Sequence, residues 1–519
     1  MKTFKSHLRR FAGTVGVAVL ATLPSAAQTG PPAAPTQGSI VNQLPLSGQT
    51  QLNGGVTSVQ VPVAATTASV NTLNTSVQAT GSFTGSVDGI SKSPFSGPLS
   101  FTDAIHRGLD FNLGTAALSQ LIRQAQGQTR VARSALLPNL DATASETVQQ
   151  LNLRAAGVRV NSPLPGLAIP AIVGPFNYFD LRAHLTQTIG DVVSLKNYRS
   201  AQELVRSNEF SLKDARDLVV LAVGGAYLQV AAAKQRVVSE QAQLNTASAL
   251  YKQASDQRGV GLIAQIDVNR SRIQMLTENE RLATLRNDLS KQKINLARMI
   301  GLPANERFDI SDSIAFASFP VLDLEATLKE AYETREDLKA AQSQVRAAQL
   351  SLSASRAERY PSLSVNADYG VIGINPNQSH GTFSAGATLT VPIWRGGRTE
   401  GDIQQADAAL VQRRSEVENI HSRIEGDVRS AYLDIEVAAN QVTVAQENLK
   451  VSRENLDLTR QKFQAGVSDN VEVVQAQQTV ASAELDLINS VLAHNVAKLS
   501  LARAIGDSAD SLTRFLKLP

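Results

Sequence analysis

The 519-residue chain contains no cysteine, and aromatic residues make up 5% of it. Without cysteine the chain cannot form disulfides, present a thiolate nucleophile, bind a metal through sulfur or carry a lipid on a thiol. The scarcity of aromatic residues argues against a thick globular core. It fits alanine-rich helices that pack closely along seams.

The chain also lacks a large excess of charge of one sign. Its 49 basic and 46 acidic residues leave a net charge of +3, which is too small to predict nucleic-acid binding. The histidines have no ligand spacing, and the sequence holds no HExxH motif, no phosphate loop and no Gly-x-Ser-x-Gly elbow. We therefore predict no catalytic residue, no cofactor and no metal, and a secreted enzyme is poorly supported.

Residues 1–27 have the pattern of a secretory signal. A basic start precedes the apolar run Phe11 to Leu23, which is too short to span a bilayer, and the small residues Ser25-Ala26-Ala27 follow. No later stretch reaches 18 uninterrupted apolar residues, so no transmembrane helix is expected.

Residues 28–98 form a low-complexity leader, and charged residues are absent from Phe11 to Val87. Such a segment buries too little apolar surface to fold alone, so we expect it to be disordered. A short strand at Val59 to Val63 is the less favoured alternative, because Pro62 confines it to a sheet edge.

What the chain has in abundance is long helical periodicity. From Thr399 to Gly506, apolar residues recur at alternating steps of three and four, which is typical of coiled coils. Turn residues interrupt this stretch once, at Gln464 to Asn470. The pattern predicts a helical hairpin whose first arm, about 65 residues, is ~97 Å long.

The same hairpin occurs earlier in the chain, from Val192 to Met299. A shift of 205 positions aligns the two without a gap: it places Tyr227 on Tyr432, Gly261 on Gly466, Asp267 on Glu472 and Gly301 on Gly506. A helix closed by a proline, expected over 99–135 and again over 323–359, and a pair of alternating strands precede each hairpin. Thr102 or Asp103 is expected to cap the first of these helices. We therefore divide the chain into a first repeat (99–303), a linker (304–322), a second repeat (323–506) and a C-terminal tail (507–519).

The predicted fold is mainly helical, with four strands per chain that each have one apolar face. Their lengths suit an oblique bilayer crossing, for which ~9–11 residues suffice. Strands in lipid must close into a barrel, and single-chain bacterial barrels begin at eight strands. Four strands cannot close, so two copies would give eight strands and three would give twelve. The aromatic residues at strand ends are expected at the membrane interfaces: Tyr178, Phe179, Tyr360 and Trp394.

At its hairpin turns the sequence resembles the TolC-like outer-membrane efflux proteins. Gly259 to Val268 is similar to that family's first periplasmic tip, and Phe463 to Gln477 is similar to its second. The resemblance covers roughly Leu99 to Gly506. It implies a homotrimer with a twelve-stranded barrel in the outer membrane and a helical tunnel in the periplasm. It also implies a periplasmic adaptor at the tips and an inner-membrane transporter that supplies the energy.

Two sets of tip residues follow. Adaptor docking is expected at Val260, Gly261, Leu262, Gly466 and Val467. The resemblance places the periplasmic entrance at Asp267, Phe463, Ser468, Glu472 and Gln475, with Glu472 in an acidic ring. Complementing a helix dipole is the alternative role of the two acidic residues. The family's second acidic, tyrosine and arginine positions are Gln475, Phe463 and Ser468 in this chain, so we expect its closed state to be held differently.

The function expected from these features is passive conduction, as the exit duct of a tripartite efflux or type I secretion system. The alternative is a soluble periplasmic coiled-coil adaptor, which explains the hairpins but not the strand pairs. The sequence leaves the cargo open among drugs, metals and proteins.

Overall fold

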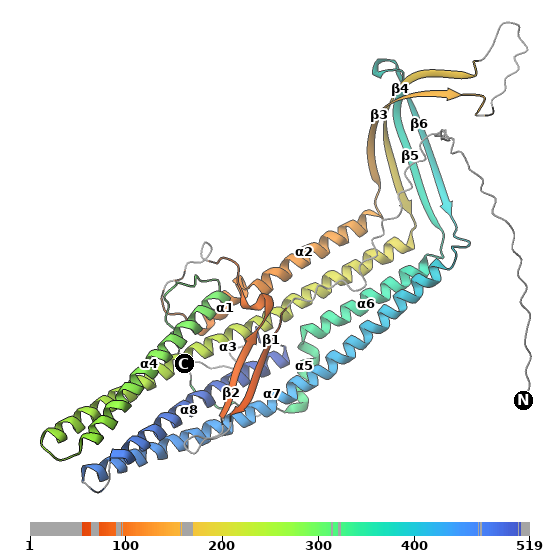
Figure 1. The fold of residues 1–519 in the computed structure, drawn as a ribbon. Coiled ribbons are helices and arrows are strands. Elements are labelled where there is room, and N and C mark those ends of the chain that lie inside the picture. Colours follow the sequence, from red (N-terminus) through yellow and green to blue (C-terminus); the bar gives the residue numbers. More distant parts are fainter. Residues whose placement is uncertain are drawn as a thin grey trace, which may run out of the picture. The chain divides into compact units, whose positions relative to one another are not determined.

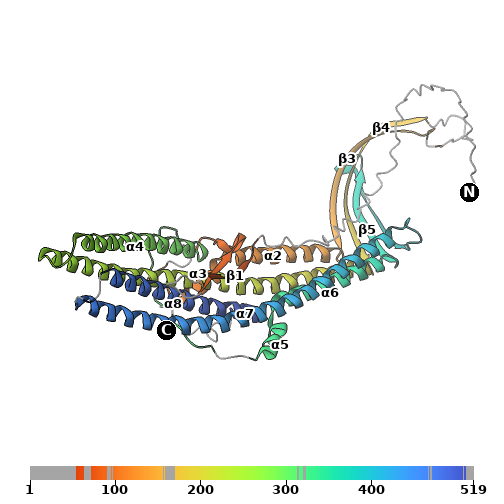
Figure 2. The same cartoon turned by 60° about the horizontal axis from the view of Figure 1, so that its bottom comes forward.

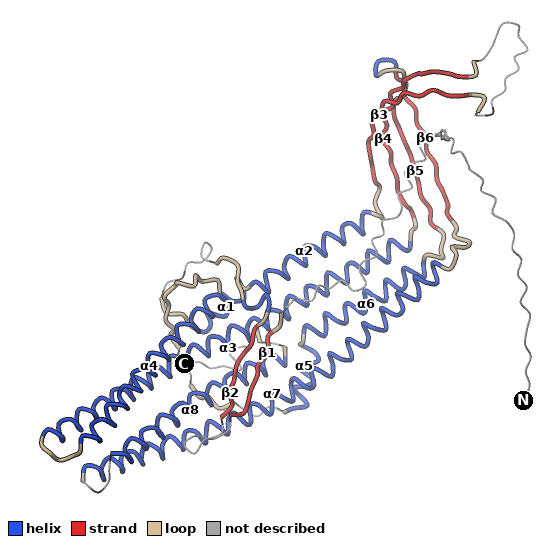
Figure 3. Tube along the Cα trace, in the orientation of Figure 1, coloured by secondary structure: helices blue, strands red, loops and turns tan. Residues whose placement is uncertain are grey.

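The computed structural model describes residues 54–63, 72–89, 95, 97–155, 157, 170–312, 315–319, 323–465, 467, 470–506 and 508–509. The predicted signal lies outside this part of the chain. The described residues form long helices, a four-stranded sheet and a two-stranded sheet (Figures 1 and 3).

Each repeat contains two shorter helices, two strands and a long helical hairpin. The first repeat consists of α1 (Phe101–Phe111), α2 (Leu113–Ser134), β3 (Asn139–Asn152), β4 (Ile172–Ile189), α3 (Val192–Gly259) and α4 (Gln265–Met299). The second consists of α5 (Leu324–Thr334), α6 (Glu336–Ala357), β5 (Ser362–Gly373), β6 (Ser379–Thr390), α7 (Arg398–Gln464) and α8 (Asn470–Ile505).

The shorter helices of the two repeats match in length. Helices α1 and α5 both have 11 residues, and α2 and α6 both have 22. Their starts differ by 324 − 101 = 223 and 336 − 113 = 223, whereas α4 and α8 start 470 − 265 = 205 apart. The difference of 18 residues lies in the strand pair and its loop, which are longer in the first repeat.

The helix expected over residues 99–135 is interrupted at Asn112. The buried Asn112 side chain accepts a hydrogen bond from the N–H of Gly114 and donates to the carbonyls of Phe83 and Met299. These partners lie far away in sequence, so local periodicity gave no sign of the break. Arg335 interrupts the helix expected over 323–359 at the equivalent position.

The start of α1 also differs from expectation. The Ser100 hydroxyl, not a side chain at Thr102 or Asp103, accepts a hydrogen bond from the backbone N–H of Asp103. The Asp103 carboxylate in turn accepts from the Ser100 hydroxyl at 2.6 Å. Ser100 is therefore the N-cap, and Asp103 supports it from the first turn.

The expectation of a disordered leader is wrong for its described part. Strands β1 (Val56–Val63) and β2 (Thr72–Ala79) form an antiparallel hairpin that packs against α3 and α8. Pro62 is tolerated because both strands of a two-stranded sheet are edge strands. Val56 and Val77 contact the core cluster, so packing against the rest of the chain stabilises a segment too polar to fold alone.

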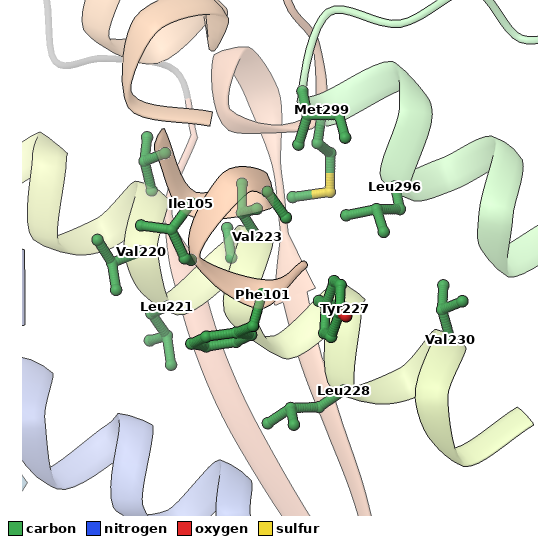
Figure 4. Close-up of a cluster of buried hydrophobic side chains, with 14 of the residues drawn as sticks. Phe101, Ile105, Val220, Leu221, Val223, Tyr227, Leu228, Val230, Leu296 and Met299 are labelled. Atoms are coloured by element: carbon green, nitrogen blue, oxygen red, sulfur yellow. The ribbon is translucent and has the colours of Figure 1, made fainter. Parts of the chain in front are cut away.

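The largest core cluster lies where α1, the middle of α3, and the ends of α4 and α8 meet (Figure 4). Phe101 packs edge-on against Tyr227 at 5.4 Å between ring centroids. This part of α3 is long and apolar enough to cross a membrane by length and composition, but 78% of that window is buried inside the protein. The sequence prediction of no transmembrane helix required 18 uninterrupted apolar residues and so overlooked this window of α3. The window is part of the protein core.

The four strands that the alternating sequence predicts form an antiparallel meander in the order β3-β4-β5-β6. It continues from the ends of α2, α3, α6 and α7 that lie farthest from the hairpin tips (Figures 1 and 2). The helices therefore connect the sheet to the two tips.

Candidate functional site

The register of the sheet separates polar from apolar side chains. Paired residues point to the same face of a sheet. One row across the four strands reads Asp141, His184, Asp368 and Ser384, and the next row on that face reads Thr143, Arg182, Gly370 and Thr382. The opposite face carries the rows Leu140, Leu185, Ala367, Ala385 and Ala142, Ala183, Tyr369, Phe383. The sheet is thus apolar on one side and polar on the other.

A hydrogen-bonded network joins the strands on the polar face. The Arg182 guanidinium bridges Asp368 at 2.6 Å and Asp180 at 3.3 Å. The Ser384 hydroxyl donates to Asp368 at 2.6 Å, and the Thr143 hydroxyl lies 3.3 Å from His184 Nε2. These groups require a wet or polar environment, whereas the exposed Leu140, Tyr369 and Phe383 on the other face require an apolar one.

The sheet also has two unpaired edges. Within the described residues, β3 pairs with β4 alone and β6 pairs with β5 alone. A sheet edge carries a row of backbone N–H and C=O groups without partners, and these cannot face hydrocarbon. A single chain therefore does not form a barrel.

The helices form a wall that, like the sheet, has two open edges. At the tip end they pack in the order α4, α3, α8, α7, and at the sheet end in the order α2, α3, α6, α7. A first-repeat helix forms one edge, and α7 forms the other. In both the sheet and the helical wall, a first-repeat element therefore lies at one open edge and a second-repeat element at the other.

Both edge helices at the tip end expose apolar stripes. On α7 the exposed residues follow a spacing of four and then seven: Leu433, Val437, Val444, Val451 and Leu458. On α4 they are Ile266, Ile273, Leu276 and Ile294. A seven-residue repeat is the signature of a coiled-coil seam, so the α7 stripe is a helix-packing surface that is uncovered in one chain.

The first hairpin tip is a well-defined helix stop. The N–H of Leu262 donates to the carbonyl of Gln257, and the N–H of Gly261 donates to the carbonyl of Arg258. This is a Schellman motif, and Gly261 supplies its left-handed residue with φ of +79°. The N–H of Val467 makes the equivalent bond to Lys462 at the second tip.

The predicted docking residues lie at these turns. Val260 and Leu262 are each 73% exposed, and no heavy atom lies within 4 Å of the position of a Cβ on Gly261. Val467 is exposed as well, whereas Gly466 lies outside the described residues. Both tips lie at the same end of the helical wall (Figures 1 and 2).

The predicted entrance residues lie close to the tips. Asp267 is in the first turn of α4, 3.4 Å from the Arg270 guanidinium, and Glu472 is exposed in the first turn of α8. Gln475 is also exposed. Phe463 packs against an apolar cluster formed by α7 and α8, to which α3 also contributes. Ser468 lies outside the described residues.

The four aromatic residues lie at two levels of the sheet. Tyr360 precedes β5 and Trp394 follows β6, both at the helix end, and both are exposed. Phe179 pairs with Gly373, the last residue of β5, at the opposite end. The prediction that Tyr178 and Phe179 lie at the end of their own strand is wrong, because β4 begins at Ile172.

Sequence reasoning missed a buried charge cluster on the wall. Arg335 donates hydrogen bonds to Asp337 at 2.7 Å and to Asp427 at 2.8 Å, while Arg503 pairs with Asp214 at 2.6 Å. Burial alone would raise the pKa of Asp337, but the arginines outweigh it and lower that pKa to about 2. The cluster joins α3, α6, α7 and α8, and no local pattern in the sequence marks it.

The comparisons with known proteins agree with this architecture. The family model described as outer membrane efflux protein matches residues 112–302 and 327–507. The pyoverdine export outer membrane protein OpmQ of Pseudomonas aeruginosa is 24% identical over 398 residues, which cover 74% of this chain and 80% of OpmQ. The outer membrane protein TolC of Escherichia coli is 24% identical over 391 residues, which cover 72% of this chain and 76% of TolC.

Solved structures of outer-membrane channels share the fold. The Campylobacter jejuni channel CmeC has a TM-score of 0.66 at 15% identity, with 78% of this chain and 85% of CmeC covered. The open state of the Neisseria gonorrhoeae channel MtrE has a TM-score of 0.66 at 17% identity, with 78% and 88% covered. The comparisons give no support to the soluble adaptor. Because the family model matches well over half of the sequence, the chain belongs to the outer membrane efflux protein family.

Proposed function

We propose that three copies of this chain form one passive duct through the outer membrane and the upper periplasm. The observation that supports this most is the open wall. The edge strands of the sheet are β3 and β6, and the edge helices near the hairpin tips are α4 and α7. Both rows have a first-repeat element at one edge and a second-repeat element at the other. Joining β6 and α7 of one copy to β3 and α4 of the next closes both rows at once.

The two edges of the chain differ, so the contact between copies is heterologous. A heterologous contact gives a closed ring when its rotation closes. Two copies would give an eight-stranded barrel, whose interior is just wide enough for side chains. Three copies give twelve strands and leave room for the charged network around Arg182 together with a water-filled passage.

The barrel orientation follows from the two faces of the sheet. Strands β5 and β6 have 12 residues each, enough to cross the bilayer at a tilt, for which ~9–11 residues suffice. The face with Leu140, Tyr369 and Phe383 contacts lipid, and the face with Asp141, Arg182 and Asp368 lines the passage. Tyr360 and Trp394 then lie at the periplasmic interface, and Tyr178 and Phe179 lie toward the outer one.

The helical part extends into the periplasm and makes the contacts with partners. Val260, Gly261, Leu262, Gly466 and Val467 receive a periplasmic adaptor, and an inner-membrane transporter drives the cargo. The chain catalyses no reaction. Relatives that are 24% and 21% identical are named for pyoverdine export and for antibiotic efflux, so identity at this level does not select a cargo.

The entrance of the passage lies between the tips of the three copies. Asp267, Phe463, Ser468, Glu472 and Gln475 are within a few residues of the turns in the sequence, and we assign them to this entrance. Three Glu472 carboxylates near one axis attract cations and repel one another. The entrance is therefore narrow and cation-preferring until the partners open it.

Disulfide crosslinking tests the ring, because the chain has no cysteine of its own. Ala142→Cys in β3 is combined in turn with Ala385→Cys, Ala387→Cys and Leu389→Cys in β6, all on the apolar face. We expect at least one pair to give dimers and trimers on a non-reducing gel, because β3 and β6 of neighbouring copies pair directly.

Ala183→Cys is the matched control, since it shares a row with Ala142 but lies on β4, which already has two partners. The same β6 positions should give no ladder with Ala183→Cys. A chain that enters the outer membrane and gives no ladder with Ala142→Cys at any position would contradict the ring.

A further inference from the structure

The seam between α3 and α4 contains two glutamates. Buried residues of both helices recur here at steps of seven: Glu240, Ala247 and Ala254 on α3, and Ser271 and Glu278 on α4. A step of seven marks the positions that face the partner helix in a coiled coil. Glu240 and Glu278 are 3% and 6% exposed, so both carboxyl groups lie inside the seam.

The second hairpin has alanine at both places. The shift of 205 positions places Glu240 on Ala445 of α7 and Glu278 on Ala483 of α8, and both alanines are fully buried. Alanine has no polar side-chain atom to desolvate, whereas a buried carboxylate is costly unless it is paired. The first hairpin therefore carries a pair of acids where the repeat requires only small apolar side chains.

Each of the two carboxyl groups has one oxygen with a partner and one without. The Arg281 guanidinium lies 3.3 Å from Oε2 of Glu240, and the Gln274 amide donates to Oε1 of Glu278. Oε1 of Glu240 and Oε2 of Glu278 are buried and have no hydrogen-bond partner among the described residues. The two carboxyls are within hydrogen-bonding reach of each other. A proton on either one converts two acceptors that repel into a donor and an acceptor.

The surrounding charges favour such a proton. Glu484 of α8 adds a third negative charge nearby, and its carboxylate pairs with Arg453 of α7 at 2.8 Å. Arg281 of α4 supplies a positive charge to Glu240, but its side chain is 42% exposed, and solvent screens its effect. Arg236 of α3 lies one turn away and donates its hydrogen bond to α8 instead.

The pKa of Glu240 is consistent with these contacts. Burial, and then the hydrogen bond and the charge of Glu278, raise this pKa from 4.5 to about 8. When two acids interact this strongly, the proton belongs to the pair and not to either residue. The contacts thus favour one proton for the two carboxyls at neutral pH.

We propose that Glu240 and Glu278 form a proton-binding site: they share one proton at neutral pH, and its loss in alkaline medium weakens the contact between α3 and α4. This inference goes beyond the proposed duct and does not depend on it, because both carboxyls belong to one chain. The site lies about 20 residues, or ~30 Å, from the end of α3 at the first tip. Two carboxylates also attract divalent cations, but no group of three acidic or histidine ligands exists among the described residues.

Infrared difference spectroscopy of the detergent-solubilised full chain detects the proton itself. A protonated carboxyl has a C=O stretching band that a carboxylate lacks. The wild type at pH 7 should show this band relative to Glu240→Gln and relative to Glu278→Gln, because in each variant the remaining glutamate ionises beside an amide donor. The band should vanish at pH 10, and it should be the same with Ca²⁺ as with EDTA.

Difference spectra without this band at pH 7 would overturn the proposal, because both carboxyls would then be ionised. A band that is present in EDTA and lost with Ca²⁺ would also overturn it, because a divalent cation would then occupy the pair. If a single variant does not fold, the double variant Glu240→Ala with Glu278→Ala serves as the reference, since it copies the seam of the second hairpin.

Hydrogen exchange measures the effect of the proton on the hairpin. Because the folded-state pKa of Glu240 is raised, its contribution to stability is complete below pH 4.5 and is lost as the pH rises through about 8. At pH 9, amides of residues 236–247 and 274–285 should exchange about tenfold faster in the wild type than in Glu278→Gln. The glutamine keeps the hydrogen bond to Glu240 without adding a second charge.

The second hairpin provides the internal control for this comparison. Its equivalent residues, 441–452 and 479–490, should exchange equally in the wild type and in Glu278→Gln at the same pH. Glu447→Gln is the matched control variant, because Glu447 is exposed on α7 and pairs with Lys450, and it should behave as the wild type. Equal exchange of the first hairpin in the wild type and Glu278→Gln at pH 9 would contradict the weakened contact.

Discussion

The charge cluster at Arg335 gives the sharpest prediction for stability. The Arg335 side chain is 3% exposed and lies between Asp337 and Asp427, whose side chains are 12% and 45% exposed. Arg335→Ala would leave the Asp337 carboxylate buried with its main partner removed. Breaking a buried ion pair in this way costs about 3–5 kcal/mol, because the remaining charge stays desolvated.

The pKa of Asp337 gives a separate measure of the same loss. Burial opposes ionisation, but the hydrogen bonds and charge of Arg335, with help from Arg503 and Arg423, lower the pKa from 3.8 to about 2. That difference corresponds to about 2 kcal/mol of stability. Because the folded-state pKa is lowered, this contribution is present above pH 3.8 and is lost as the pH falls toward 2.

The assay is the melting temperature of the detergent-solubilised protein, followed by the circular dichroism of its helices at fixed concentration. Arg335→Ala should melt several degrees below the wild type at pH 7, with a smaller gap at pH 3. Arg335→Lys should be intermediate, because lysine keeps the charge but cannot reproduce the paired hydrogen bonds. Arg429→Ala is the control: its partner Glu425 is four residues away and both side chains are about half exposed, so the pair contributes at most ~0.5 kcal/mol. Equal melting of Arg335→Ala and Arg429→Ala would refute the reasoning.

Three further predictions concern the entrance, His494 under the linker, and the wall. Glu472→Ala should lower the preference for cations in planar-bilayer recordings, and unchanged selectivity would remove Glu472 from the entrance. Burial, and then the charge of Lys498, lower the pKa of His494 from 6.5 to about 4. The contribution of His494 to the free energy of unfolding is therefore complete above pH 6.5, and about 3 kcal/mol of it is lost as the pH drops toward 4. His494→Gln should flatten that acid dependence of the melting temperature, and an unaltered slope would show that another group titrates. Val444→Asp with Val451→Asp, on the exposed stripe of α7, should dissociate the trimer in detergent without loss of helix, whereas intact trimers would show that the stripe is not an interface.

The repeated elements were predictable because each has a regular period. The arms of both hairpins, the four strands and the turn at Gly261 follow from spacing alone, and the 205-residue shift fixes where they recur. The shorter helices recur with a shift of 223 residues, which places the interruption at Asn112 on the one at Arg335, but the two residues differ in type and neither interruption was predicted.

The elements that sequence reasoning missed are held by contacts between distant residues. Asn112 breaks its helix for carbonyls at Phe83 and Met299, and Arg335 for carboxylates that include one on α7. The β1–β2 hairpin packs closely on α3 at Gly225, where an added Cβ would lie 2.3 Å from a Val77 methyl carbon, and composition cannot reveal this contact. Local sequence patterns therefore predicted the helices and strands of the wall. The contacts that hold these elements together join residues far apart in the sequence and were not predicted.

The proposed duct depends on the closure of an open wall by identical copies, and the number of copies in the assembly tests this most directly. Native mass spectrometry of the wild-type protein, extracted from the outer membrane in mild detergent, measures that number. We expect a single species with the mass of three mature chains. A stable single chain in the membrane extract, with β3 and β6 left unpaired, would contradict the account.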